Sequence, residues 1–147
     1  MKTRLLFILL SLLLCQWTIA QQTISSGKLI EYSRFNSTIV PSRDVFVWLP
    51  TDYSTKERYD VLYMHDGQML FDANTTWNKQ EWGIDEVVGK LLNEKKIRSC
   101  IVVGVANIPE TRYADYFPQK ALRNLPDSVV SGNVSFNADN YLRFLVE

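Results

Sequence analysis

The sequence predicts an α/β protein in which an antiparallel strand pair leads into a parallel sheet with crossover helices. Two segments rich in β-branched and aromatic residues lie in the first third of the chain, and a strand, an amphipathic helix and a second strand follow them. A strand–helix–strand order needs a crossover connection, which is right-handed in nearly all proteins and joins parallel strands. These two observations together decide the fold class.

The antiparallel pair is predicted from residues 28–34 and 44–49. Both segments alternate or cluster β-branched and aromatic side chains, which suit the half-buried surface of a sheet. Pro41 and Ser42 lie between them and favour a turn. We therefore expect two neighbouring antiparallel strands at the start of the domain.

The parallel part begins with residues 61–64, a short apolar run typical of a strand buried on both faces. From Trp82 the spacing of apolar residues changes to that of a helix. Residues 101–106 form another apolar run rich in β-branched residues, which predicts the second parallel strand. The helical stripe between these strands consists of Ile84, Val87, Val88, Leu91 and Leu92.

Residues 108–137 have little periodicity and contain three prolines, which predicts long loops with short helical turns. The segment from Ala138 to Glu147 begins like a helix, and no strand follows it. A parallel sheet needs cover on both faces, and the predicted elements are too few to supply it. We therefore expect the chain to be a fragment of a larger domain or a truncated gene product.

The first twenty residues are predicted to be a secretory signal peptide cleaved near Ala20. Lys2 and Arg4 precede an apolar run over residues 5–14, and Ala20 ends a pattern of small residues. The run is shorter than the roughly 20 residues that span a bilayer, so no stable membrane anchor is expected. The predicted location is secreted or periplasmic, with a polar leader over residues 21–27 and the domain over residues 28–147.

The composition excludes some classes of partner. The chain carries 16 Lys and Arg against 16 Asp and Glu, without a long block of like charge. Nothing therefore predicts binding to nucleic acid, and a small or neutral molecule is the favoured partner. Cys100 is the single cysteine beyond the predicted signal peptide and is expected to be a buried structural thiol.

The strongest candidate site is the loop His65-Asp66-Gly67-Gln68, which directly follows the first predicted parallel strand. Ligands of open parallel sheets bind beyond the carboxyl ends of the strands, where this loop must lie. Glycine lets backbone N–H groups approach a ligand oxygen, as in an oxyanion hole. The alternative is an ordinary turn from strand to loop.

Several motifs in this order resemble the putative esterase family of α/β-hydrolases, which includes enterochelin esterases, feruloyl and acetyl-xylan esterases, and esterase D. The resemblance implies that the chain is the truncated N-terminal portion of an α/β-hydrolase fold. It also implies a serine esterase with a Gly-x-Ser-x-Gly nucleophile, followed by an acid and a histidine. It also implies that Gly67 and Gln68 are the oxyanion-hole candidates. The motifs are Leu49-Pro50-x-x-Tyr53, residues 61–68 with Phe71-Asp72, Trp82-x-x-Asp85-Glu86, Val102-Val103-Gly104-Val105 with Asn107, and Arg112-x-x-x-Tyr116-x-Pro118.

The chain contains no Gly-x-Ser-x-Gly, so the nucleophile, acid and base are expected downstream of Glu147, and the chain alone is expected to be inactive. His65 is the only histidine, but no activated serine is recognisable for it to serve as a base. We expect His65 and Asp66 to order the loop by hydrogen bonding. No catalytic residue is assigned within the chain.

Trp77, Arg112 and Tyr116 are candidates for the substrate wall, because aromatic and polar groups together suit a phenolic or sugar-linked ester. The aromatic residues suit a core equally well. For Arg112 the alternatives are binding of an anionic substrate and pairing with Glu110 or Asp115, and the pairing is expected. No cofactor and no metal are predicted, since Asp66, Asp72 and Asp85 are expected to be solvated loop acids or helix caps. The predicted function is an exported carboxylic-ester hydrolase, and the alternative is a non-catalytic exported module that binds a carbohydrate or a protein.

Overall fold

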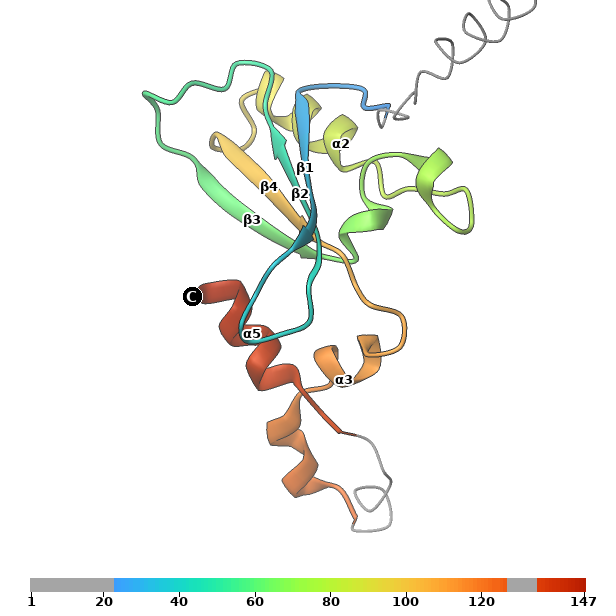
Figure 1. Ribbon diagram of the computed structural model, residues 1–147. Helices are drawn as coiled ribbons and strands as arrows, with labels where there is room; N and C mark the ends of the chain where they lie inside the picture. The colour runs from blue at the N-terminus through green and yellow to red at the C-terminus, as the bar shows by residue number, and fades with distance from the viewer. Residues whose placement is uncertain (1–22, 127–134) are drawn as a thin grey trace, which may run out of the picture.

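The structure is a computed structural model that describes residues 23–126 and 135–147 (Figure 1). The predicted signal peptide and the first two residues of the polar leader lie outside this range. The described helices and turns are η1 (Gly67–Met69), η2 (Ala73–Thr75), α2 (Ile84–Asn93), α3 (Arg112–Tyr116), η3 (Gln119–Asn124) and α5 (Ala138–Val146).

Within these ranges four strands form one mixed sheet in the order β1-β2-β4-β3 (Figure 1). β1 (Lys28–Phe35) is antiparallel to β2 (Arg43–Leu49), and β2 is antiparallel to β4 (Cys100–Val105). β3 (Asp60–His65) is parallel to β4, with His65 opposite Val105. This topology confirms the predicted antiparallel pair and the parallel strands that α2 connects.

The two faces of the sheet bury different clusters, because successive residues of a strand point to opposite sides. On one face, Trp48 of β2 and Val102 of β4 are fully buried. They belong to one cluster with Val88 of α2 and with Leu70 and Phe71, which follow η1. On the other face, Val105 of β4 packs with Val40 and with Tyr141 of α5. One helix thus covers each face. The helix predicted from Trp82 is confirmed as α2, and the helix predicted from Ala138 is confirmed as α5.

The prediction that β3 is buried on both faces is wrong in this chain. Val61, Leu62 and Tyr63 are 46%, 44% and 53% exposed. The reason is position, because β3 lies at the edge of the sheet and pairs with β4 alone among the described strands. An apolar run identifies a strand that suits an interior, but burial depends on what lies next to it.

The end of the polar leader is held to α2 and to the loop before it. The backbone N–H of Thr23 donates to Asp72 at 2.9 Å, and that of Ser25 donates to Asp85 at 2.6 Å. The Ser25 hydroxyl also donates to Glu86. The described residues 23–27 are therefore hydrogen-bonded to the domain and form part of its structure.

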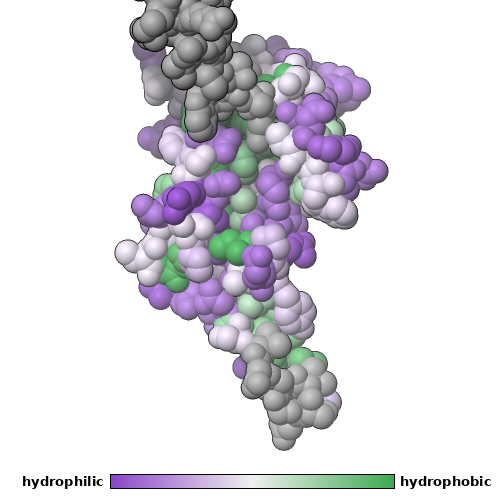
Figure 2. All heavy atoms as spheres, turned by 45° about the vertical axis from the view of Figure 1, so that its right-hand side comes forward, coloured by the Kyte–Doolittle hydropathy of each residue, from purple (hydrophilic) through white to green (hydrophobic). Residues whose placement is uncertain are grey.

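Polar residues cover most of the face in Figure 2, and the apolar residues there form small patches between them. No helix in the described ranges is long and apolar enough to cross a membrane. The predicted long loop after β4 contains α3 and η3, as expected, and residues 127–134 of it lie outside the described ranges. Cys100 is buried, which confirms its prediction, and burial raises the pKa of its thiol.

Candidate functional site

The turn that follows β3 is built from a strained aspartate and a tightly packed glycine. Asp66 has a left-handed backbone, with φ 55° and ψ 43°, and precedes the short helix η1. A Cβ on Gly67 would lie 2.5 Å from the carbonyl carbon of Gly104 in β4. Any side chain at position 67 would therefore push the turn away from the sheet.

Three side chains hold the Asp66 carboxylate from the opposite side of the turn. Arg112 donates from Nε at 2.9 Å and from Nη2 at 2.7 Å, the Asn107 amide donates at 2.7 Å, and the Tyr116 hydroxyl donates at 3.3 Å. The Arg112 hydrogen bonds lower the pKa of Asp66, although burial opposes them. The carboxylate therefore stays charged and joins the ends of β3 and β4 to α3, an arrangement called here the Asp66 clamp.

Gln68 is tied to the same end of β4. Its side-chain oxygen accepts a hydrogen bond from the backbone N–H of Asn107 at 3.2 Å. In the described part of the chain, the backbone N–H of Gln68 itself has no hydrogen-bond acceptor. The turn thus presents the unused backbone donor of Gln68 at the carboxyl ends of two parallel strands, where ligands of such sheets bind.

Asn107 contributes two of these bonds but is absent from the residues that the sequence proposed for the site. Its place in the chain offers a signal, because it is a polar residue just beyond a buried strand. Parallel strands bring such residues to one edge of the sheet, beside the loop at Asp66 and Gln68.

His65 does not bond to its own loop. Its Nδ1 lies 3.2 Å from the Tyr141 hydroxyl of α5, and its ring lies 4.7 Å from that of Tyr116, centroid to centroid. The hydrogen bond therefore joins the end of β3 to α5. Burial raises the pKa of Tyr141, so its hydroxyl remains a neutral donor or acceptor.

A cavity of about 420 Å³ opens beside His65, between α3, η3 and α5. Tyr116, Tyr141, Leu142 and Leu145 supply much of its wall, and Asp139 and Lys120 stand among the polar residues that line it. Its chemistry suits a flat apolar group with a polar end.

Of the predicted substrate-wall residues, two reach this region and one does not. Tyr116 lines the cavity, and Arg112 holds Asp66, so its expected pairing with Glu110 or Asp115 is wrong. Trp77 is 86% exposed in the loop after η2, and no hydrogen bond or ring contact joins it to the Asp66 clamp. The sequence could not place the partners of Arg112, because Asp66 lies 46 positions away.

Asp115 is paired with Arg43 of β2 instead. The Arg43 Nη2 lies 3.2 Å from the Asp115 carboxylate, and both side chains are 1% exposed. Thr111 and Asn137 also donate to Asp115, at 3.0 and 3.3 Å, and the Arg43 guanidinium lies 4.9 Å from the centre of the Tyr141 ring. This buried pair fixes α3 and α5 to the sheet beneath the cavity.

The acids that could have suggested a metal have other roles. Across the described ranges, no group of three or more His, Cys, Asp or Glu residues could hold a metal ion. Asp72 caps η2, as one of the two alternatives predicted. The prediction of solvated or capping acids is wrong for Asp66 and Asp85, because both are buried. Each accepts hydrogen bonds from a residue distant in the chain, Arg112 for Asp66 and Ser25 for Asp85.

The comparisons with known proteins identify the class of protein. The sequence model of a family described as Putative esterase matches residues 37–146. The chain belongs to this esterase family, and its fold is the N-terminal portion of an α/β-hydrolase fold. A search of curated proteins found no matching sequence.

Solved structures of esterases are similar to the chain. A CE1 ferulic acid esterase from Anaeromyces mucronatus, solved without substrate, is 18% identical with a TM-score of 0.50 over 90% of this chain and 44% of that one. A structure of that esterase with ferulic acid is 19% identical, with a TM-score of 0.47 over 86% and 42% of the two chains. A mutant feruloyl esterase module from Clostridium thermocellum, complexed with sinapinate, is 17% identical, with a TM-score of 0.43 over 70% and 35%. The chain thus spans less than half the length of each.

Proposed function

We propose that this chain supplies the oxyanion side of an exported serine carboxylic-ester hydrolase. Its substrate is a small-molecule ester with a phenolic or sugar-linked group. The nucleophile, the acid and the base come from further sequence of the same protein. A signal peptide over residues 1–20 and a polar leader over residues 21–27 precede β1, and residues 23–27 of this leader are part of the domain.

The observation that carries this proposal is the unused N–H of Gln68 in a turn that the Asp66 clamp holds rigid. Acyl transfer develops negative charge on the former carbonyl oxygen of the ester. A donor that is already fixed in place stabilises this charge without reorganising during the reaction. Membership of the esterase family supports the assignment of this donor to that role.

The clamp has a further electrostatic consequence for such chemistry. An unpaired carboxylate at Asp66 would lie two residues from the proposed donor and would repel a developing oxyanion. The bidentate pairing with Arg112 compensates this charge. Asp66 and Arg112 are therefore positioning residues in the proposal, whereas Gln68 touches the reacting oxygen.

The reaction then follows the general course of covalent ester hydrolysis. A serine attacks the ester carbon, the alcohol leaves, and water hydrolyses the acyl-serine intermediate. The cavity beside His65 is proposed to receive the apolar part of the substrate, with Tyr116 and Tyr141 on its walls. His65 is not the base in this proposal, because the chain contains no Gly-x-Ser-x-Gly serine for it to activate.

Labelling with a fluorophosphonate probe tests the proposal on the full-length gene product. The expected result is one covalently labelled serine that lies outside the 147 residues of this chain. Absence of any labelled serine would contradict the esterase mechanism. The chain expressed alone is expected to give no inhibitor-sensitive hydrolysis of p-nitrophenyl acetate, and turnover there would contradict the division of roles.

A further inference from the structure

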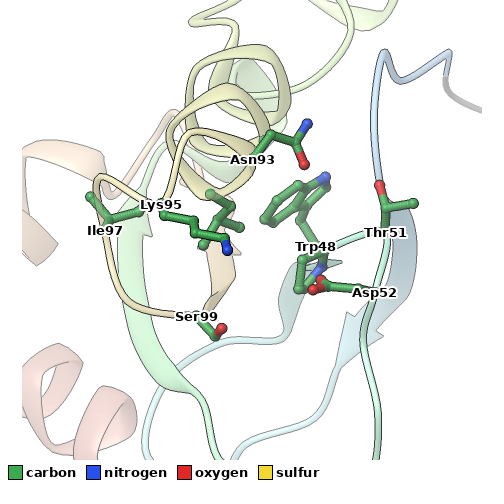
Figure 3. Close-up of a pocket in the computed structure, with 10 residues that line it drawn as sticks. Trp48, Thr51, Asp52, Asn93, Lys95, Ile97 and Ser99 are labelled. Carbon is green, nitrogen blue, oxygen red and sulfur yellow. The ribbon is translucent and has the colours of Figure 1, made fainter.

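A second cavity lies at the other end of the sheet from the Asp66 clamp (Figure 3). It has a volume of about 370 Å³ and lies between the end of β2, the last turns of α2 and the segment that enters β4. The clamp sits where β4 ends, whereas this cavity sits where β4 begins. The two sites are therefore separated by the length of that strand.

The floor of this cavity is apolar and rigid. Leu92 and Ile97 supply accessible apolar surface, and Ile97 is 39% exposed, whereas Trp48 is fully buried. The indole Nε1 donates to the carbonyl of Ser26 at 2.8 Å, so the ring cannot turn without losing that bond. A fixed apolar floor suits the C–H face of a ligand that also carries polar groups.

The rim is polar, and hydrogen-bonded turns hold its backbone. Thr51 and Asp52 occupy a turn that the Tyr53 N–H closes on the Pro50 carbonyl at 3.0 Å. The carbonyl of Ser99 accepts from the backbone N–H of Asp60 at 3.0 Å. The rim is therefore ordered before any ligand binds, which lowers the entropic cost of binding.

Lys95 on this rim has a backbone conformation that glycine would adopt more easily. Its φ is 53°, and it directly follows the last turn of α2, where its N–H donates to Leu92 and that of Lys96 donates to Leu91, each at 2.9 Å. Glycine is the usual residue at this position of a helix end. A lysine there costs stability, which is a reason to look for a role of its side chain.

The side chain of Lys95 reaches over the cavity toward Trp48, and Asp52 lies on the opposite side (Figure 3). In the described ranges, neither side chain makes a hydrogen bond or an ion pair, and the same holds for the side chains of Thr51, Asn93 and Ser99. Five polar groups thus surround one apolar floor with their hydrogen-bonding capacity unused.

We propose that this cavity binds a neutral carbohydrate, of the size of one or two sugar rings. One cation and one anion on the rim cancel, so the site as a whole does not demand a charged ligand. Hydroxyl groups both donate and accept, as a rim with an ammonium, a carboxylate, an amide and two hydroxyls requires. Leu92 and Ile97 then cover one face of a sugar ring. This inference is independent of the proposed esterase chemistry, because it uses no residue of the Asp66 clamp.

Titration of the full chain with cellobiose and xylobiose, followed by ¹H–¹⁵N NMR, tests the inference. Saturable shifts are expected at the amides of Thr51, Asp52, Lys95 and Ser99 at millimolar sugar. Inorganic phosphate is the charged comparison, and tighter binding of phosphate than of both sugars would overturn the assignment. Absence of saturable shifts at these amides with either sugar would overturn it as well.

Two variants separate binding from folding. Lys95→Gly removes the ammonium and places the favoured residue at the helix end, so the fold is expected to be kept and sugar affinity to fall at least about fivefold. Lys96→Gln is the matched control, because Lys96 pairs with Glu94 and does not line the cavity. Equal sugar affinity of Lys95→Gly and the unmodified chain would contradict a role for this side chain.

Discussion

Replacement of Arg112 by methionine tests whether the Asp66 clamp holds the turn. The variant keeps the aliphatic part of the side chain but loses the two hydrogen bonds at 2.9 and 2.7 Å. A buried hydrogen bond to a charged group contributes about 1.5–3 kcal/mol. The Arg112 side chain is 51% exposed and that of Asp66 10%, so solvent screens part of this energy. We expect the free energy of unfolding to fall by about 1–2 kcal/mol in total.

Urea unfolding of the full chain at neutral pH measures this change. Arg143→Met is the matched control, because Arg143 forms an exposed pair with Glu147 one helical turn away. Its loss should cost only about 0.3–0.5 kcal/mol. Asp66→Asn removes the charge without adding backbone strain, because asparagine also tolerates the left-handed conformation at this position. In a double-mutant cycle, the loss of unfolding free energy in the double variant Asp66→Asn/Arg112→Met should be smaller than the sum of the losses in the two single variants.

The pH dependence of the same measurement gives an independent check. The folded-state pKa of Asp66 lies below its ordinary value of 3.8, since Arg112 stabilises the charged form. The contribution of the pair is therefore present above about pH 3.8 and is lost as the pH falls through the lower folded-state pKa. The difference between the unmodified chain and Arg112→Met should narrow in acid. An effect of Arg112→Met no larger than that of Arg143→Met, or one independent of pH, would refute the reasoning.

Three further changes probe the elements around the site. Arg43→Met should lower the free energy of unfolding by about 3–5 kcal/mol in a urea titration, because it leaves the buried Asp115 without its cation. A much smaller loss would mean that the hydrogen bonds from Thr111 and Asn137 are enough to stabilise the Asp115 carboxylate. Gly67→Ala should shift the NMR amide signals of the turn and of Gly104, because the added Cβ meets β4, and an unchanged spectrum would contradict this packing. Burial and three neighbouring carboxylates raise the pKa of Glu81 above its ordinary value of 4.5. Ionisation of Glu81 therefore lowers the stability of the folded state as the pH rises above 4.5. Glu81→Gln should raise the melting temperature at pH 7 but not at pH 4. An equal effect at both pH values would exclude the charge as the cause.

Much of the local structure could be predicted from the sequence. The periodicity of apolar residues placed β2, α2 and β4 within a few residues, because a helix and a strand repeat at different intervals. The loop at residues 65–68 was predicted at a strand end, and the structure places it there. These predictions depend on neighbours within about ten positions of the chain, which is the range over which such patterns extend.

The partners of the charged groups could not be predicted in this way. Arg112 has two acids close to it in sequence, and yet it binds Asp66, which the crossover through α2 and β4 brings beside it. Arg43 pairs with Asp115 at a separation of 72 positions. Nothing local in the sequence distinguishes these carboxylates from solvated ones.

By itself, the sequence determined the order of the strands and of the two longer helices, with strand ends placed within a few residues, and that a glycine turn follows the first parallel strand. Only the tertiary structure decided that this turn is clamped, that β3 lies at an edge, and that a polar rim surrounds Trp48. Secondary structure follows from interactions between residues near one another in the chain, whereas burial and charge pairing depend on which distant segments the fold brings into contact.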